Sequence, residues 1–378
     1  MDVSVVILNY NVKYHLDACI QTLLQAMKNI DGEIIVADNA STDGSREYFK
    51  NKYQNEVKFL WFNENYGFAK AYNKAVQHAK GKYLLILNPD TLVSEDAVEK
   101  LIEFAKNTPD AGIIGGKMID GTGNFLPESK RGIPTPWTSF WKLSGIYKIL
   151  NFPPFNKYYA PHLKADETGK VQILTGAFMF MEKELFEKVG GFDERYFMFG
   201  EDVDLSYTVL LEGKTNYYYP EAKIIHFKGE STVKDKTYVN NFLNATFQFQ
   251  KKFFHIFALN SSLTKLFFKI WLGLKIKKSI KMKDYNYKTA FYFGEAEHVF
   301  FVQRAGYPKI IHLEDIDLMI PGDRTLIIDM SSIKFSEIIP IMEKLSKKNI
   351  QFRFYFPKNN LLIGSDSKDQ LGIAYRLN

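Results

Sequence analysis

The sequence predicts an α/β protein that begins with a mostly parallel sheet flanked by helices. Residues 1–90 alternate strand-like and helix-like segments, which is the pattern of connected strand–helix–strand units. The strand-like runs, such as Val3–Leu8 and Tyr83–Leu87, are almost continuously apolar and rich in branched side chains. Such runs suit strands that are buried on both faces, as in a parallel sheet covered by helices.

We predict the individual elements from hydrophobic periodicity and from the Gly, Pro, Asn and Asp residues that separate the periodic segments. The strands expected first are Val3–Leu8, Glu33–Ala37, Val57–Phe62 and Tyr83–Leu87. The helices between them are Tyr14–Met27, Arg46–Lys52 and Ala69–Ala79. Further along we expect a helix at Ser94–Lys106, strands at Ala111–Ile119 and Val171–Met181, and a helix at Glu182–Val189.

Composition places the chain among globular proteins. Hydrophobic residues make up 46% and charged residues 24% of the 378 residues. The single cysteine, Cys19, excludes an internal disulfide and fits a reducing compartment, so we expect a cytoplasmic location. The N-terminus leads directly into strand-like sequence, so no signal peptide is expected. No apolar run reaches the roughly 18 residues of a membrane-spanning helix.

Polar clusters follow the first, second and fourth of these strands: Asn9–Asn11, Asp38–Asp43 and Asn88–Asp90. The carboxyl ends of parallel strands share one edge of the sheet, where ligands of open α/β sheets bind. A carboxylate there can hold a divalent cation, and the cation a diphosphate. Each cluster alone reads equally as a turn, but three on one edge favour a site. The glycine-rich dinucleotide and Walker motifs are absent from the sequence.

A second acidic cluster opens a predicted helix at Glu201 and Asp202. The segment before this helix is rich in aromatic residues, including Tyr196 and Phe199, which would desolvate these carboxylates. A desolvated carboxylate has a raised pKa, which makes it a better general base. Plain helix capping is the alternative reading. His226 ends an apolar run, where a histidine is either a core or turn residue or a ligand. In Thr175–Ala177, backbone around Gly176 can approach a ligand closely, and the irregular stretch 120–170 reads as a functional loop or lid.

These motifs together, in this order and spacing, resemble family 2 glycosyltransferases, particularly the rhamnosyltransferase-like branch. The matching segments are Val3–Asn11, Asp38–Ser45, Asn63–Ala69, Asn88–Asp90, Thr175–Ala177, Gly191–Asp193 and Gly200–Leu205. The resemblance covers about residues 1–245. It implies a GT-A-type fold and an inverting, metal-dependent transfer of a sugar from a nucleoside diphosphate.

The resemblance also implies roles for single residues. Asp38 is expected to contact the nucleobase, with Asn9 and Asn39 beside it. Asn88 is expected at the ribose, while Asp90 and His226 are expected to hold Mg²⁺ or Mn²⁺ against the diphosphate. The remaining residues expected to bind the nucleotide sugar are Asn65, Gly67 and Gly176. Asp202 is the expected catalytic base, with Glu201 beside it. Asn88 departs from the family's Asp at this position, so one negative charge is missing.

The function expected is a hexosyltransferase that moves a sugar, with rhamnose one candidate, to a saccharide or lipid-linked acceptor in surface polysaccharide synthesis. One alternative is a nucleotidyltransferase, although Val3–Asn11 lacks the basic, glycine-rich phosphate loop that such an enzyme needs. The other alternative is a non-catalytic scaffold that binds a nucleotide sugar. Retention of both Asp90 and the Glu201–Asp202 pair argues against a scaffold.

Three regions are expected: a catalytic domain at 1–235, a basic helical segment at 236–284 and a small α/β domain at 285–378. The basic segment has no Asp or Glu between Lys236 and Lys283 and many aromatic residues. It suits an amphipathic helix on the inner face of the cytoplasmic membrane, or a helical arm that packs on the catalytic domain. No nucleic-acid motif accompanies the charge, so nucleic acid is not an expected partner. Oligomeric state is left open.

The C-terminal region reads again as α/β, without a motif that carries chemistry. Its expected strands are Lys288–Gly294, Val299–Gln303, Lys309–His312, Thr325–Asp329 and Gln351–Phe356, and its expected helix is Ser336–Lys348. A regulatory, oligomerisation or scaffold role is expected for it.

Overall fold

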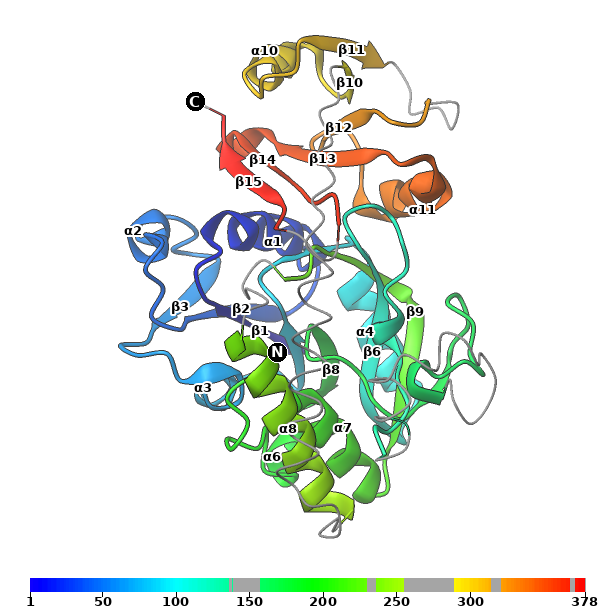
Figure 1. Ribbon diagram of the computed structural model, residues 1–378. Coiled ribbons are helices and arrows are strands. Elements are labelled where there is room, and N and C mark those ends of the chain that lie inside the picture. The colour runs from blue at the N-terminus through cyan, green and yellow to red at the C-terminus, as the bar shows by residue number, and fades with distance from the viewer. Residues whose placement is uncertain are drawn as a thin grey trace.

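The computed structural model describes residues 1–135, 138, 157–229, 236–254, 289–313, 321–367 and 371–377. Two sheets, each with its own helices, make up the molecule (Figure 1). This is the expected α/β class, with a mixed, mostly parallel first sheet and a second, smaller mixed sheet.

The first sheet has nine strands. They are β1 (Val3–Asn9), β2 (Gly32–Asp38), β3 (Val57–Trp61), β4 (Tyr83–Leu87), β5 (Thr91–Val93), β6 (Ala111–Ile119), β7 (Gly169–Val171), β8 (Phe178–Glu182) and β9 (Thr215–His226). The order across the sheet is β3-β2-β1-β4-β8-β6-β9-β5, and β7 pairs with β9. Strands β1 to β4 are mutually parallel, whereas β8 runs antiparallel to β4 and to β6.

Helices cover both faces of this sheet because its strands are apolar on both faces. All five side chains of β4 are buried. The helices are α1 (Lys13–Ala26), α2 (Ser45–Phe49), α3 (Gly67–Val76), α4 (Ala97–Lys106), α6 (Lys183–Lys188), α7 (Glu201–Leu211) and α8 (Lys236–Phe254). In α1 the apolar side chains of Leu16, Ile20 and Leu23 recur at helical spacing and are fully buried.

The second sheet has the order β11-β10-β12-β13-β14-β15. Its strands are β10 (Thr289–Phe293), β11 (Lys309–Leu313), β12 (Thr325–Asp329), β13 (Gln351–Phe356), β14 (Leu361–Gly364) and β15 (Ile373–Arg376). Its helices are α10 (Val299–Gln303) and α11 (Phe335–Leu345). The sheet lies beside α1 and above the first sheet in Figure 1, and α11 packs against β9.

One predicted strand is wrong. Val299–Gln303 forms the short helix α10, not a strand. A five-residue apolar run cannot be assigned by periodicity alone. In the fold, Val302 is fully buried while Phe300 is 59% exposed, so only one side of the run faces the core. That one-sided burial suits a helical turn at the protein surface.

The described part of the basic segment, α8, is a helix that packs on the region of the first sheet. Its Phe249 is 2% exposed and belongs to a cluster with Ile173 and Val203. Lys252 pairs with Asp193 and Asp204 at 2.9 and 2.7 Å. In this respect α8 is the predicted helical arm. The alternative, that segment 236–284 lies on a membrane, stays a prediction, and residues 255–284 lie outside the described part of the chain. The boundaries at 235 and 285 stay predictions as well.

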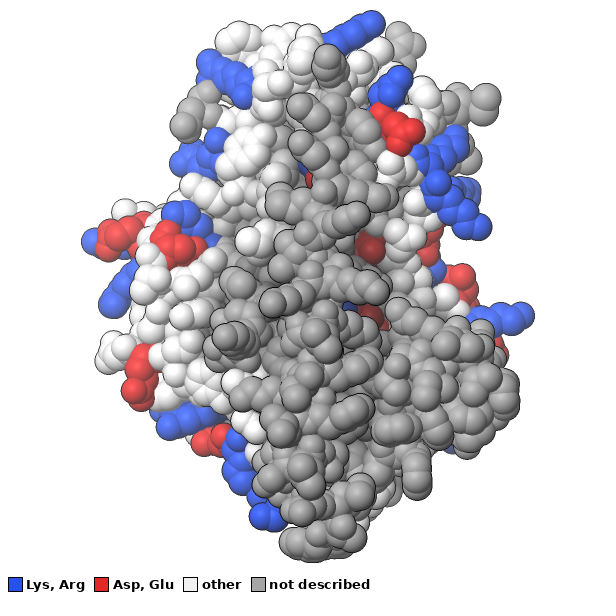
Figure 2. Space-filling model, in the orientation of Figure 1, with Lys and Arg blue, Asp and Glu red and all other residues white. Residues whose placement is uncertain are grey.

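Charges of both signs are interspersed among the described residues at the margins of the face shown in Figure 2. Within the described part of the chain, we find no helix with both the length and the apolar character needed to span a bilayer.

Candidate functional site

The carboxyl ends of β2, β1 and β4 lie side by side, because these strands are adjacent and parallel. Asn9 at the end of β1 stands opposite Asp38 at the end of β2. The Asn9 amide donates hydrogen bonds to Asp38 Oδ2 at 2.7 Å and to Ser45 Oγ at 3.1 Å. The backbone N–H of Ser41 donates to Asp38 Oδ1 at 2.8 Å. Asp38 is therefore buried and fixed in orientation.

A second set of amides lies next to this pair. Asn39 donates from Nδ2 to Asn65 Oδ1 at 2.8 Å and to the carbonyl of Gly67 at 3.2 Å. Gly67 has φ +75°, and a Cβ there would lie 2.5 Å from the carbonyl oxygen of Phe197. The backbone N–H of Phe68 donates to that same oxygen at 2.8 Å. The close approach of the two loops therefore requires glycine at this position.

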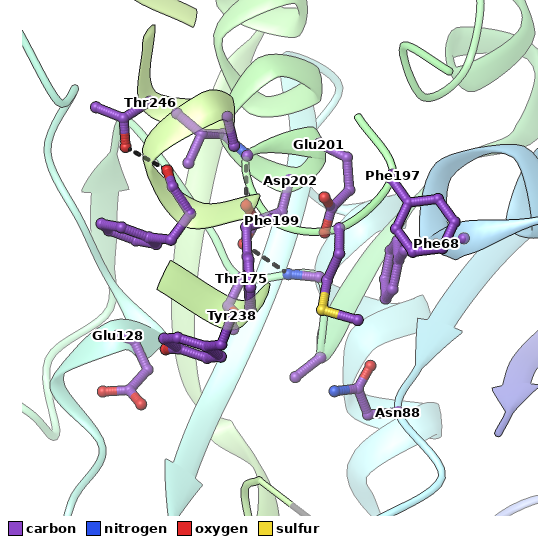
Figure 3. A pocket seen from close by; sticks show the side chains of 18 of the residues that line it. Phe68, Asn88, Glu128, Thr175, Phe197, Phe199, Glu201, Asp202, Tyr238 and Thr246 are labelled. Atoms are coloured by element: carbon purple, nitrogen blue, oxygen red, sulfur yellow. Dashed lines mark hydrogen bonds between the residues drawn. The ribbon is translucent and has the colours of Figure 1, made fainter. Parts of the chain in front are cut away.

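One cavity of about 410 Å³ connects most of the predicted residues. Those that line it are Asn39, Asn65, Gly67, Asn88, Gly176, Glu201, Asp202 and His226. Asn9, Asp38 and Asp90 are buried and are not among the described residues that line the cavity. Figure 3 shows Glu201 and Asp202 next to each other, and Asn88 apart from them at the lower right of the view.

Asp90 and His226 are brought together by the antiparallel pairing of β5 with β9. The backbone N–H of Phe227 donates to the carbonyl of Asp90 at 3.0 Å. His226 Nε2 then lies 3.3 Å from Asp90 Oδ1, and both side chains are buried. Burial acts to raise the pKa of Asp90, but the neighbouring His226 and His15 outweigh it and hold that pKa below its usual value.

This pair fits a divalent cation as two of its ligands. Carboxylate oxygen and imidazole nitrogen are ligands that Mn²⁺ accepts. His226 Nδ1 is buried without a hydrogen-bond partner among the described residues. Within those same residues, no group of three or more His, Cys, Asp or Glu side chains is arranged to hold a metal ion. Further ligands would have to come from a bound diphosphate and water.

The second acidic cluster opens α7. Gly200 precedes the helix with φ +84°, and Glu201 and Asp202 occupy the first turn, where the helix dipole favours carboxylates. Asp202 Oδ2 accepts hydrogen bonds from Arg131 Nη2 at 2.6 Å and from the backbone N–H of Gly176 at 3.1 Å. The Asp202 carboxylate is thus paired and oriented.

Glu201 has a different environment, although it is the next residue. Its Oε2 is buried and has no hydrogen-bond partner among the described residues. Burial, followed by the negative charge of Asp202, raises the pKa of Glu201 to about 8. Near neutral pH, the pair therefore consists of a largely protonated Glu201 and an Asp202 that forms an ion pair with Arg131.

Sequence reasoning missed three parts of the cavity wall. Arg131 comes from the irregular stretch 120–170 and contacts both Asp202 and the carbonyl of Leu174. Glu128 and Lys228 form an ion pair that lines the cavity. Burial acts to raise the pKa of Glu128, but Lys228 outweighs it and lowers that pKa to about 2. No local sequence pattern marks these residues, because each contact joins segments far apart in the chain.

The third missed part is the aromatic wall formed by α8 and the loop before α7. Tyr238 and Phe242 of α8 contact Phe199, with ring centroids 4.8 and 6.2 Å apart. All three rings line the cavity, as does Thr246. In Figure 3, Tyr238 and Phe199 stand on the side of the cavity opposite Phe68 and Phe197. The basic, aromatic composition of this segment was visible in the sequence, but its contact with the site was not.

The comparisons with known proteins agree with these motifs. The model of the family described as glycosyl transferase family 2 matches residues 4–190. The N-acetylglucosaminyl-diphospho-decaprenol L-rhamnosyltransferase of Mycobacterium tuberculosis is 29% identical over 246 residues, which cover 61% of this chain and 78% of that protein. The poly-beta-1,6-N-acetyl-D-glucosamine synthase of Staphylococcus aureus is 27% identical over 216 residues, which cover 56% of this chain and 47% of that protein.

Among solved structures, one of GalNAc-T7 with UDP, GalNAc and Mn²⁺ is similar with a TM-score of 0.48 and 19% identity. The similarity covers 66% of this chain and 48% of that one.

Proposed function

The chain belongs to glycosyl transferase family 2, and from this premise we propose that it is an inverting hexosyltransferase of the GT-A type. As a glycosyltransferase it acts on a sugar donor and an acceptor. We propose a nucleoside diphosphate sugar as the donor and a saccharide or lipid-linked saccharide as the acceptor. The names of the two relatives above support a role in surface polysaccharide synthesis, and rhamnose as the first donor sugar to test.

One observation carries this proposal: a single cavity is lined both by amides at the carboxyl edge of the sheet and by an ion-paired carboxylate. Asn65 and Asn88 suit hydrogen bonds to a nucleoside. Asp202, held by Arg131, suits a base. An inverting displacement needs one carboxylate to take the acceptor's proton and no protein nucleophile. The arrangement of the cavity supports this chemistry.

In the reaction that we propose, the acceptor hydroxyl enters beside the aromatic wall and donates its proton to Asp202 Oδ as its oxygen attacks the anomeric carbon. The bond from that carbon to the diphosphate breaks on the opposite side, and the nucleoside diphosphate leaves. Arg131 holds the Asp202 carboxylate by an ion pair before the acceptor arrives. Phe199 and Tyr238 exclude water, which would otherwise take the sugar.

Asp90 and His226 would hold a divalent cation, which when bound supplies positive charge to the leaving diphosphate. Metal dependence is part of this proposal.

The test is a screen of nucleoside diphosphates and their sugars by thermal shift of the purified protein, with and without Mn²⁺. A ligand that binds only the folded state raises the melting temperature, and its concentration dependence gives an affinity. We expect one nucleoside diphosphate to stabilise the protein more in the presence of Mn²⁺. We also expect the corresponding nucleotide sugar to be hydrolysed slowly when no acceptor is present. If no nucleoside diphosphate or sugar nucleotide stabilises the protein, the proposed function is wrong.

A further inference from the structure

Lys228 is a cation of the cavity wall to which the mechanism above gives no role. It lies two residues after His226, just beyond β9, with φ +57°. Its ammonium forms an ion pair with Glu128 Oε1. The Lys228 side chain is 38% exposed and that of Glu128 is 20% exposed, so the pair is open to the cavity.

Two permanently charged cations occur among the described residues that line the cavity, Arg131 and Lys228. Arg131 is only 11% exposed and already donates to Asp202 and to the carbonyl of Leu174. A lysine ammonium, in contrast, has three donors. Of the described residues, only Glu128 accepts a hydrogen bond from it. Arg131 Nε also lacks a hydrogen-bond partner among the described residues but is buried, so Lys228 is the exposed lining cation with donors left for a ligand.

The position of the Lys228 ammonium donors indicates which ligand they bind. Lys228 lines the cavity two residues after His226, which also lines it and pairs with Asp90. The cations that line the cavity already face carboxylates of the protein, because Arg131 pairs with Asp202 and Lys228 with Glu128. A diphosphate brings at least two further negative charges, which need additional donors at this end of the cavity. Lysine commonly binds phosphate in this way, as a point charge.

We propose that Lys228 binds the diphosphate of the donor, and that Glu128 is a positioning residue that holds the ammonium in the cavity. This rests on the proposed function and adds a residue to its donor site. Glu128 occupies one of the three ammonium donors, which leaves the others free for phosphoryl oxygens.

The competing explanation is that the ion pair is only structural. Glu128 is largely buried, and a buried carboxylate without its partner is costly. On that view, Lys228→Met would weaken nucleotide binding indirectly, because it leaves a bare negative charge beside the diphosphate. Neutralising Glu128 would then restore binding. If Lys228 contacts the diphosphate, neutralising Glu128 does not replace the lost donors.

The experiment is a double-mutant cycle with Lys228→Met, Glu128→Gln and the combined variant. Calorimetry measures the dissociation constants of the nucleoside diphosphate that the wild type binds best and of its nucleoside. Lys228→Arg tests rescue by another cation. Lys100→Met is the matched control, because Lys100 also forms a half-buried ion pair, with Asp96 at 2.7 Å, but does not line the cavity.

We expect Lys228→Met to weaken binding of the nucleoside diphosphate about 10- to 100-fold, as for loss of a charge-assisted hydrogen bond. Binding of the nucleoside should weaken less than about 2-fold, because the nucleoside has no phosphate. The combined variant should bind the nucleoside diphosphate about 10- to 100-fold more weakly than Glu128→Gln alone. Neither of these two variants contains a charged Glu128 without its partner, so the difference between them reports the loss of the Lys228 ammonium. Lys228→Arg should stay within a few-fold of the wild type, and Lys100→Met should match it.

Full recovery of affinity in the combined variant, or an equal loss for nucleoside and nucleoside diphosphate, would overturn the assignment of Lys228. Either outcome leaves the proposed function intact, because the wild type still binds the nucleotide. If the wild type itself binds no nucleoside diphosphate, the proposed function fails, and the role of Lys228 fails with it.

Discussion

Glu201 and Asp202 are adjacent residues with opposite electrostatic environments. Asp202 accepts hydrogen bonds from the Arg131 guanidinium and from two backbone N–H groups, those of Gly176 and Val203. Glu201 is buried with an unpaired Oε2, and its pKa is raised to about 8. A general base must be ionised when the acceptor arrives. At neutral pH this condition favours Asp202 as the base and leaves Glu201 as a neutral hydrogen-bonding group.

Replacing Asp202 by Asn should therefore lower turnover severely while leaving donor affinity nearly unchanged. The amide has the size of the carboxylate but cannot take a proton, and loss of a general base costs about 10²- to 10⁴-fold in rate. Transfer rate and nucleotide affinity are measured in parallel for Asp202→Asn and Glu201→Gln. If Glu201→Gln has the larger loss of turnover, the base is Glu201.

Glu201 should also make stability depend on pH. Its pKa is raised in the folded protein from 4.5 to about 8, so between these values the folded state binds the proton that the unfolded state releases. The contribution of this group to stability is therefore present in full below pH 4.5 and is lost as pH rises towards 8, by an amount on the order of a few kcal/mol.

The variant Glu201→Gln removes that titration. Relative to the wild type, its melting temperature should be higher at pH 8 than at pH 5, as measured by thermal unfolding in matched buffers. A difference that is the same at both pH values would show that Glu201 titrates normally.

Asp90 is predicted to bind the metal. Asp90→Ala removes one of the two paired ligands and leaves His226 without its carboxylate. We expect Mn²⁺ no longer to tighten nucleotide binding, and transfer to be abolished. Calorimetric titration of the nucleotide with and without Mn²⁺ measures the first effect. Equal tightening by Mn²⁺ in the variant and the wild type would remove Asp90 from the metal site.

At the scale of elements, the sequence predicts best where pattern and burial agree. Tyr83–Leu87 is strand β4 with the predicted bounds, because an unbroken apolar run before Asn-Pro is compatible with little else. The same holds for Thr325–Asp329 and Gln351–Phe356, which are β12 and β13. Where a run is short and only partly buried, as in Val299–Gln303, local preference does not decide between strand and helix.

Some residues of the candidate site can be predicted from the sequence, and others cannot. Amides and carboxylates such as Asn9 and Asp38 are predictable, because each ends a strand whose position in the sheet follows from alternation. The pairing of Arg131 with Asp202, 71 residues apart, is not predictable, because it depends on how an irregular loop crosses the sheet. The pair of Lys228 and Glu128 spans 100 residues and is invisible to local pattern for the same reason.

Helix α8 is amphipathic, and aromatic side chains on it pack on the region of the first sheet. Phe249 is 2% exposed and contacts Tyr207, with ring centroids 5.8 Å apart. Phe249→Ala should lower the free energy of unfolding by about 3 kcal/mol, the usual cost of deleting a buried aromatic ring. Lys251→Ala, at an exposed position of the same helix, should change it little. Denaturant unfolding measures both, and equal stability of both variants would mean that α8 does not pack as described.

At the scale of the whole molecule, the two sheets are joined by one apolar core and by polar contacts. The core cluster contains Ile225 and Phe227 of the first sheet region together with Phe354 of the second. Glu95, before α4, accepts hydrogen bonds from the first backbone N–H groups of α11 at 2.7 and 3.1 Å. Asp17 of α1 is buried and accepts from Asn359 of the C-terminal region at 2.9 Å. These contacts bind the second sheet to elements that carry the site.

Phe227 is the point at which this core meets the site, because it stands between His226 and Lys228. Its ring packs on Phe354 of β13, with centroids 6.1 Å apart, and on His15 of α1 at 5.7 Å. The position of the His226–Lys228 turn therefore depends on packing from the C-terminal sheet. This packing favours the scaffold role among the three expected for the C-terminal region, and that role stays a prediction.

The prediction that follows is that both sheets unfold in one cooperative transition. Each sheet also has apolar clusters of its own, but the shared cluster couples the two sheets, because unfolding of either sheet exposes apolar side chains of the other. Phe354→Ala removes a ring from the shared cluster at a cost of about 3–5 kcal/mol. Loss of nucleotide binding and loss of far-UV circular dichroism should coincide on heating, and both should shift to lower temperature together in the variant. If Phe354→Ala instead separates an early transition, with nucleotide binding retained after it, the C-terminal sheet is an independent domain and does not support the site.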